Sequence, residues 1–198
     1  MKKQILFFAF LILISASNLF AQTTEQQATK IRQLYADTNK RIDDGLKDKT
    51  SGFHYAAWTI GGERDGQQWS AIGTMETRNE FWFDGEPNMD AEATQDARKL
   101  VRKIVSSHKA ATNTASRSEY LFDEKGELFF VFSRGNAESE NGATLERRFY
   151  FIKGKLIRIV RGSKNVDAKF SAADLNAAQN ESDLAKRLQN LFALMMAE

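Results

Sequence analysis

The chain has 198 residues, with 28 basic and 26 acidic side chains, two histidines and no cysteine. The absence of cysteine excludes disulfides, thiol catalysis, thiolate metal sites and a lipid-anchored cysteine. The near balance of charge argues against a nucleic-acid-binding protein, which would carry a basic excess. The length suits a single domain held together by its own core.

The N-terminus has the three parts of a secretory signal peptide. Two lysines stand near the start, ten apolar residues occupy positions 5–14, and Ala21 precedes a polar residue. A membrane-spanning helix needs about 20 apolar residues, so an uncleaved N-terminal anchor is the weaker alternative. We therefore expect residues 1–21 to be a signal peptide, cleaved after Ala21 or, alternatively, after Ala16, and residues 22–198 to form one mature domain.

Loss of this leader removes two lysines and no acidic residue, so 26 basic side chains remain against 26 acidic ones. A neutral mature chain also argues against a polybasic membrane-binding surface. Export and the lack of cysteine together indicate a bacterial periplasm or the exterior. No transmembrane anchor is expected after cleavage.

Residues 24–44 are expected to form the first amphipathic helix. Ala28, Ile31 and Tyr35 recur at three- and four-residue spacing, and Gly45 suits the turn that ends a helix. An extended region follows, with one strand over residues 53–60 and a long or bulged strand pair over residues 69–83. A bend is expected at residues 76–79, and residues 84–87 stop the sheet.

Residues 91–111 are expected to form a second amphipathic helix, capped by Asp90. Its apolar stripe would contain Ala93, Ala97, Leu100, Val101, Ile104, Val105 and His108. Its opposite side would carry Arg98, Lys99, Arg102, Lys103 and Lys109. We interpret this basic side as a solvated face, with binding of anionic lipid or polysaccharide as the alternative.

Two hairpins are the clearest local signals. In residues 120–132, a turn with Gly126 in the left-handed region joins two aromatic-rich strands. This turn would place five side chains on one face: Tyr120, Phe122, Leu128, Phe130 and Phe132. In residues 148–160, Lys153 and Gly154 form the turn.

Three segments echo one another: residues 80–83, 119–122 and 148–151. Each has a charged residue, an aromatic, any residue and then Phe. Their separations of 39 and 29 residues exclude a fixed-period repeat, so we interpret them as recurring strands of one antiparallel meander.

Residues 172–196 are expected to be helical, opened by a capping box of Ser171 and Asp174, with a possible break at residues 180–183. Strands 120–132 and 149–160 carry apolar residues on both faces, which requires a sheet covered at least partly on both sides. The expected fold is α+β: an antiparallel sheet of five or six strands covered by three amphipathic helices, N-terminal, middle and C-terminal.

No sequence motif indicates a catalytic site or a metal site. His54 and His108 lie on different elements and form no pair at metal-ligand spacing, so neither a metal nor a cofactor is expected. His108 is interpreted as a core or boundary histidine, and no serine stands in a nucleophile-elbow motif. Residues 138–142 resemble a calcium loop but fail the EF-hand spacing, so we interpret them as a solvated loop.

Four arginines of the second hairpin are the candidate binding residues: Arg147, Arg148, Arg158 and Arg161. Their forked donors could hold an anionic ligand or partner. The alternative is a charged, solvated sheet edge, with Glu146 paired to one of them, that prevents edge-to-edge aggregation.

Three tryptophans, Trp58, Trp69 and Trp82, are expected in the core, with stacking on sugars or a partner as the alternative. The function expected is a non-enzymatic binding or protein-interaction module, whose partner is an envelope protein, a peptide or an anionic ligand. The alternative is a small hydrolase or isomerase with a cone-shaped curved sheet, using a buried carboxylate and a single histidine. A purely structural envelope component is a third reading.

Overall fold

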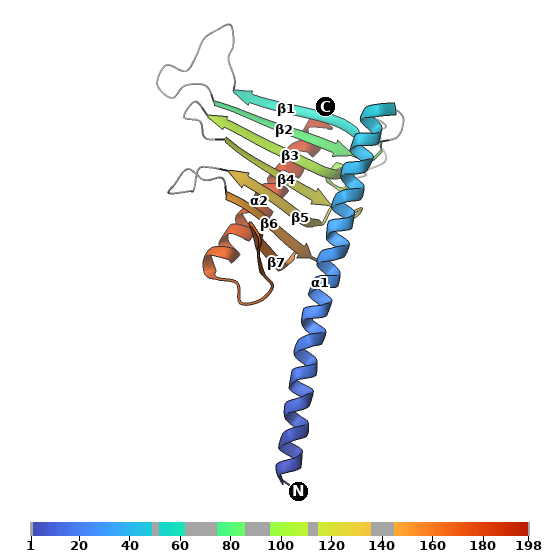
Figure 1. The fold of residues 1–198 in the computed structure, drawn as a ribbon. Helices are drawn as coiled ribbons and strands as arrows, with labels where there is room; N and C mark the ends of the chain where they lie inside the picture. The colour runs from blue at the N-terminus through green and yellow to red at the C-terminus, as the bar shows by residue number, and fades with distance from the viewer. Residues whose placement is uncertain are drawn as a thin grey trace.

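The computed structural model describes residues 2–48, 52–61, 75–85, 96–110, 115–135 and 145–197, with the side chains of the first helix described from Thr24 onward. These residues form two α-helices and one antiparallel sheet of eight strands (Figure 1). The helices are α1 (Lys2–Asp48) and α2 (Ala172–Met195). The strands are β1 (His54–Gly61), β2 (Met75–Phe83), β3 (Val101–Ala110), β4 (Ala115–Phe122), β5 (Leu128–Gly135), β6 (Leu145–Ile152), β7 (Lys155–Arg161) and β8 (Lys164–Val166).

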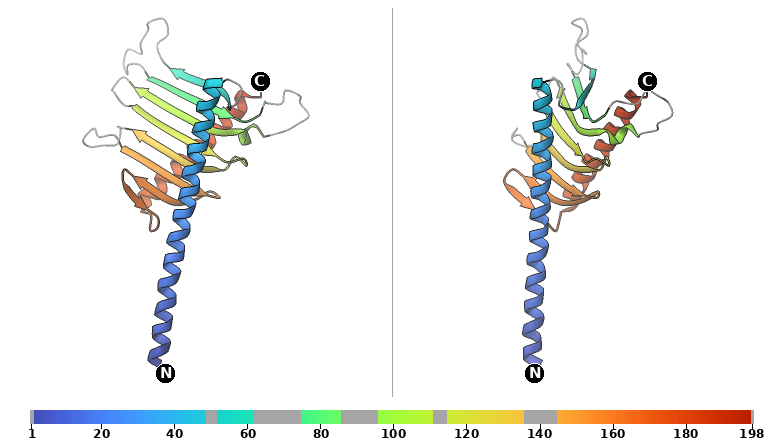
Figure 2. Two further views of the ribbon diagram at one scale, coloured as in Figure 1. Left: turned by 45° about the vertical axis from the view of Figure 1, so that its right-hand side comes forward. Right: turned by 90° about the vertical axis from the view of Figure 1, so that its right-hand side faces the viewer.

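The strands follow one another in the sheet in chain order, so the sheet is an up-and-down meander. α1 and α2 lie on opposite faces of it (Figure 2). The predicted α+β class and antiparallel sheet are therefore confirmed. The described residues contain eight strands where five or six were expected, and two α-helices where three were expected.

The predicted middle helix is wrong. A short 3₁₀ turn, η1 (Ala97–Lys99), precedes β3, and β3 occupies the positions assigned to the helix. Val101, Ile104 and Val105 are all fully buried. Because β3 is a central strand with cover on both faces, its apolar residues do not alternate, and a short β-branched run of this kind imitates helical spacing.

The face of the sheet toward α2 has a core row with one residue on each of six adjacent strands. Cross-strand pairing joins these residues, each at most 1% exposed: Phe81, Ile104, Tyr120, Val131, Phe149 and Ile159. The row explains the three echoing segments, because their aromatics Phe81, Tyr120 and Phe149 stand in register on β2, β4 and β6. Phe192 of α2 packs on this row, with its ring centroid 5.4 Å from that of Phe81.

The turn at Gly126 is confirmed by its φ of 79°, but the predicted facing of the first hairpin is wrong. Leu121 pairs with Phe130 and Phe122 pairs with Leu128, so a bulge inserts one extra residue. One extra residue moves the following side chains to the other face. Tyr120, Phe122 and Leu128 therefore contact the α2-side core, while Phe130 and Phe132 belong to the cluster on the α1 side.

The second hairpin is confirmed, with Lys153 and Gly154 at φ of 49° and 72°. The capping box of Ser171 and Asp174 is also confirmed, and α2 continues unbroken through residues 180–183. β2 is likewise continuous through the bend expected at residues 76–79.

The helix predicted over residues 24–44 is confirmed as part of α1, which passes through Gly45 and ends at Asp48. Within the described residues, no helix combines the length and the apolar character needed to cross a membrane. Trp69 and residues 138–142 lie outside the described residues.

α1 is held to its face of the sheet by an apolar seam and a buried ion pair. Ala28 and Ile31 pack on Leu121, Phe130 and their neighbours. Beside them, the Lys103 ammonium lies 2.8 Å from the Glu119 carboxylate, and both side chains are less than 10% exposed.

Two polar side chains of α1 form hydrogen bonds with this ion pair. Lys103 Nζ also donates to Asn39 Oδ1 at 2.6 Å, and the Tyr35 hydroxyl donates to Glu119 at 3.2 Å. Since a buried charge is stable only when it is paired and hydrogen-bonded, docking of α1 supplies two of the partners that this pair requires. Lys103 was assigned to a solvated face, and the structure corrects that prediction.

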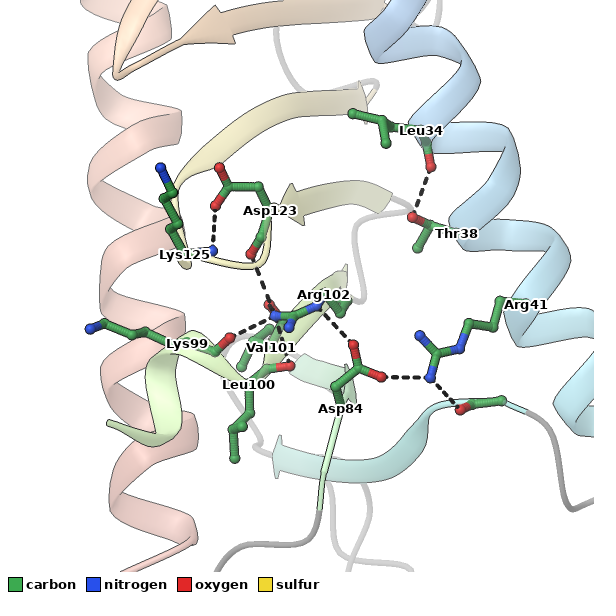
Figure 3. A network of polar contacts seen from close by, with 11 residues as sticks. Leu34, Thr38, Arg41, Asp84, Lys99, Leu100, Val101, Arg102, Asp123 and Lys125 are labelled. Atoms are coloured by element: carbon green, nitrogen blue, oxygen red, sulfur yellow. Dashed lines mark hydrogen bonds and ion pairs between the residues drawn. The ribbon is translucent and has the colours of Figure 1, made fainter. Parts of the chain in front are cut away.

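A second polar network fastens the C-terminal end of α1 (Figure 3). Asp84, just after β2, accepts from Arg41 of α1 at 2.6 Å and pairs with Arg102 of β3 at 3.0 Å. Arg102 also donates to the backbone carbonyl groups of Lys99, at 2.6 Å, and Asp123, at 3.4 Å. Arg102 is therefore a structural tether, and the basic stripe predicted for residues 91–111 does not form a single surface.

Candidate functional site

The four candidate arginines do not form one cluster. Arg147 and Arg161 are paired across β6 and β7 on the face toward α2, whereas Arg148 lies on the opposite face, with Val160 as its cross-strand partner. Strand alternation separates the two neighbours Arg147 and Arg148. The contacts and the role of these arginines are therefore described separately for the two faces of the sheet.

Arg158 is a structural anchor. Only 2% of its side chain is exposed, and it forms an ion pair with Glu25 of α1 at 2.6 Å. Asp167 accepts a second, forked pair of hydrogen bonds from it. These hydrogen bonds from Arg158 to Asp167 and Glu25 raise the pKa of the guanidinium further above its usual range. Through the same contacts, Arg158 connects β7 to α1 and to the segment before α2.

Arg148 is engaged on the α1 side. It pairs with Glu146, two residues earlier on the same strand, and its guanidinium lies 5.8 Å from the centroid of the Phe132 ring. It lines a groove of about 450 Å³ beside α1 with four aromatic residues that also belong to the α1-side cluster or pack on it: Tyr35, Phe130, Phe132 and Tyr150.

Arg147 and Arg161 line a larger groove, of about 800 Å³, between the first turns of α2 and strands β6 and β7. Asp174 of α2 forms an ion pair with Arg161 and also completes the capping box. Asn176 and Asn180 face the same space from α2. This groove combines charged and amide side chains with an apolar floor of Phe149 and Ile159.

A smaller hollow of about 140 Å³ shares Leu145 and Arg147 with that groove. Ser116 and Ser133 line it from the sheet, and Glu181 lines it from α2. Because the two spaces share residues, we treat them as one feature and call it the polar groove. Its polar and charged members are Ser116, Ser133, Arg134, Glu146, Arg147, Arg161, Asp174, Asn176, Asn180 and Glu181.

A hydrogen bond from the sheet fixes the position of Glu181. The hydroxyl of the buried Tyr120 donates to Glu181 Oε2 at 2.7 Å. Burial, and then the charge of Glu181, raise the pKa of Tyr120 well above its usual value, so the phenol stays protonated as a donor. The carboxylate of Glu181 is thus fixed at one end of the polar groove. Arg147 lies between this end and the ion pair of Arg161 and Asp174.

Sequence reasoning missed the residues contributed by β4 and β5 and by α2. One signal for the strand residues was available: on β2, β4 and β6 a polar residue stands two positions before the buried aromatic and so shares its face. These residues are Asn79, Ser118 and Arg147. The contribution of Glu181 had no local signal, because it depends on where α2 crosses the sheet.

The two histidines considered for the enzyme alternative lie on different parts of the sheet. His54 stacks on Phe83 at 5.4 Å on one part of the β1–β2 pair, and His108 contacts Thr77 Oγ1 through Nδ1 at 3.0 Å farther along the sheet. His108 is half-buried on β3, and its predicted place on a helix is wrong. Within the described ranges, no group of three or more His, Cys, Asp or Glu side chains is arranged to hold a metal ion.

A further groove of about 550 Å³ lies where the two hairpin turns meet α2. Gln189 of α2 closes its base by donating to the carbonyl groups of Arg98 and Gly126, both at 3.2 Å. Its basic side chains belong to turns and exposed helix positions, where solvation weakens their attraction for an anion.

Comparisons with family models, with curated proteins and with solved structures find no match to this chain.

Proposed function

We propose that the chain is an exported binding module and that the polar groove between α2 and the sheet is its ligand site. The observation that carries this proposal is the position of Arg147, which lines both parts of the groove and lies between two acidic residues of α2, Asp174 and Glu181. Asp174 also forms an ion pair with Arg161, and Glu181 accepts a hydrogen bond from Tyr120.

The chemistry of these side chains favours an anionic ligand with hydroxyl or amide groups. A guanidinium offers a planar fork of donors that fits a carboxylate or phosphate. The hydroxyls of Ser116 and Ser133 can both donate and accept, and Asn176 and Asn180 can do the same. Such a groove can recognise a charged end and the polar groups beside it.

Binding at this groove predicts a difference between two neighbouring arginines. Wild-type protein should show amide chemical-shift changes at β6 and α2 when hexagalacturonate or hexaglutamate is added, as measured by ¹H–¹⁵N NMR. Arg147→Gln should weaken binding by about tenfold or more, since a hydrogen bond to a charged group contributes about 1.5–3 kcal/mol. Arg148→Gln is the matched control and should leave the affinity within about twofold.

Two results would contradict this assignment. A loss of affinity in Arg148→Gln with none in Arg147→Gln would transfer the site to the groove beside α1. The absence of shift changes with both probes would remove the case for an anion-binding groove.

Export is the second part of the proposal. In Figures 1 and 2 the N-terminal half of α1 extends beyond the β7 end of the sheet. Glu25, Ala28 and Ile31, which contact the sheet, all follow the expected cleavage bond after Ala21. Removal of residues 1–21 would therefore keep the docked part of α1.

Cleavage predicts a defined mature N-terminus. Protein recovered from the periplasm of a Gram-negative host that expresses the full chain should begin at Gln22, as read by N-terminal sequencing or intact mass. A host in which signal peptidase is inhibited should accumulate the longer form. Recovery of uncleaved chain in the cytoplasm alone would contradict export.

A further inference from the structure

We infer that the ligand of the polar groove is an acidic oligosaccharide, and that its site continues from Arg147 across the sheet to Asn79 and Trp58. This inference rests on the proposed function and adds the class of ligand and the residues that select it.

A row of polar side chains runs across the sheet beside the buried core row. Cross-strand pairing places one residue on each strand from β1 to β7: Trp58, Asn79, Ser106, Ser118, Ser133, Arg147 and Arg161. They share the α2 side with the core row, because each lies two positions along its strand from a residue of that row or pairs directly with one that does. We call this the polar row.

Asn79 is the member of the polar row with a buried oxygen that is unpartnered within the described part of the chain. Its side chain faces the polar row, only 4% of the residue is exposed, and Oδ1 has no hydrogen-bond partner among the described residues. A buried carbonyl oxygen without a donor costs folding free energy, and such atoms are rare in folded proteins. A hydroxyl donated by a bound ligand would offset this cost.

Trp58 supplies an aromatic surface at the end of the row. It is 39% exposed on β1, next to Asn79 on β2, so the prediction that it lies in the core is wrong. An exposed indole can stack on the apolar C–H face of a sugar ring. The three serines between Asn79 and Arg147 are small and half-buried, and Ser118 Oγ donates to Ser133 Oγ at 3.2 Å. Each hydroxyl can both donate and accept a hydrogen bond.

Length and chemistry together favour an oligosaccharide over a peptide. Neighbouring strands lie about 4.8 Å apart, so the four intervals from β2 to β6 span roughly 19 Å, more than one sugar ring. An extended peptide that binds by strand addition pairs its backbone with a free sheet edge. The polar row instead lies on the face of the sheet and offers hydroxyl, amide, indole and guanidinium groups, which suit a hydroxyl-rich chain that carries carboxylates.

The test is calorimetric titration of the protein with three probes of equal length: hexagalacturonate, its methyl ester and hexaglutamate. Hexagalacturonate should bind at least about tenfold more tightly than either of the others, because the ester lacks the charge for Arg147 and the peptide lacks the hydroxyls for Asn79. Asn79→Ala should weaken hexagalacturonate binding by about fivefold while leaving the melting temperature unchanged or raised. Trp58→Ala should weaken it by up to about tenfold, because the stacking surface of the indole is lost.

Tyr55→Ala is the matched control for Trp58. Tyr55 is 49% exposed on the same strand, and its hydroxyl bonds to Glu80 on the α1 side, so its removal should not change the affinity. If Asn79→Ala lowers the melting temperature and leaves the affinity intact, Asn79 is structural and the inference is overturned.

The probes separate failure of the inference from failure of the proposed function. Tighter binding of hexaglutamate, lost in Arg147→Gln, would overturn the sugar ligand and keep the anion-binding groove. Equal binding of hexagalacturonate and its ester would overturn the acidic character of the ligand. If no probe binds and no amide shifts change, both proposals fall.

Discussion

Glu119→Leu should lower the free energy of unfolding by about 3 kcal/mol, measured by urea denaturation at neutral pH. The Lys103 ammonium is 7% exposed and would lose its anionic partner while remaining buried between α1 and the sheet. Removal of one member of a buried ion pair typically costs about 3–5 kcal/mol. The remaining hydrogen bond from Lys103 to Asn39 keeps the expected loss at the lower end.

Two further variants show that this loss comes from the unpaired charge. The double variant Lys103→Met with Glu119→Leu should recover most of the stability, because no charge then remains buried. Arg117→Leu should cost less than about 1 kcal/mol, since Arg117 contacts the same carboxylate at 3.1 Å but is 49% exposed. A double variant as unstable as Glu119→Leu would show that packing, not charge, controls the docking of α1.

The same pair gives the stability a pH dependence. Burial acts to raise the pKa of Glu119, but the charges of Lys103 and Arg117 outweigh burial and hold that pKa below its usual value of 4.5. A folded-state pKa below the unfolded one stabilises the protein above the unfolded pKa, and this stabilisation is lost as the pH falls through the folded pKa. The melting temperature of the wild type should therefore fall below pH 4.5 more steeply than that of the double variant.

Phe149→Ala should destabilise the fold by about 3–5 kcal/mol, the range for truncation of a buried phenylalanine. Phe149 is 1% exposed and stands between Val131 and Ile159 in the core row under α2. The loss should appear as a lower urea midpoint with little change in the dependence on urea.

Phe132→Ala is the control for this substitution. Phe132 is half-buried at the margin of the α1-side cluster, so its truncation should cost clearly less than that of Phe149. Equal losses in the two variants, or a larger loss at Phe132, would contradict the register that assigns these residues to opposite faces of the sheet.

The candidate site was only partly predictable. The arginines of the second hairpin were identified from their density in the chain, but alternation on β6 separates Arg147 from Arg148, and Arg158 is buried against Glu25. The polar row was visible in principle as a polar residue two positions before an aromatic, at Asn79, Ser118 and Arg147. The alignment of those positions across seven strands required the registers between strands.

The sequence alone determined the elements whose signals are local. The capping box at Ser171, the turns at Gly126 and Lys153–Gly154, and the α+β class follow from side-chain geometry within a few residues. Tertiary structure decided the rest. Residues 101–110 became a strand because both faces of β3 are covered, which removes the alternation that identifies a strand. A bulge between Leu121 and Phe122 moved Phe130 and Phe132 to the α1 side. The crossing of α2 over the sheet placed Glu181 and Arg147 in the same hollow. Both outcomes depend on register and packing between distant segments, which no local pattern encodes.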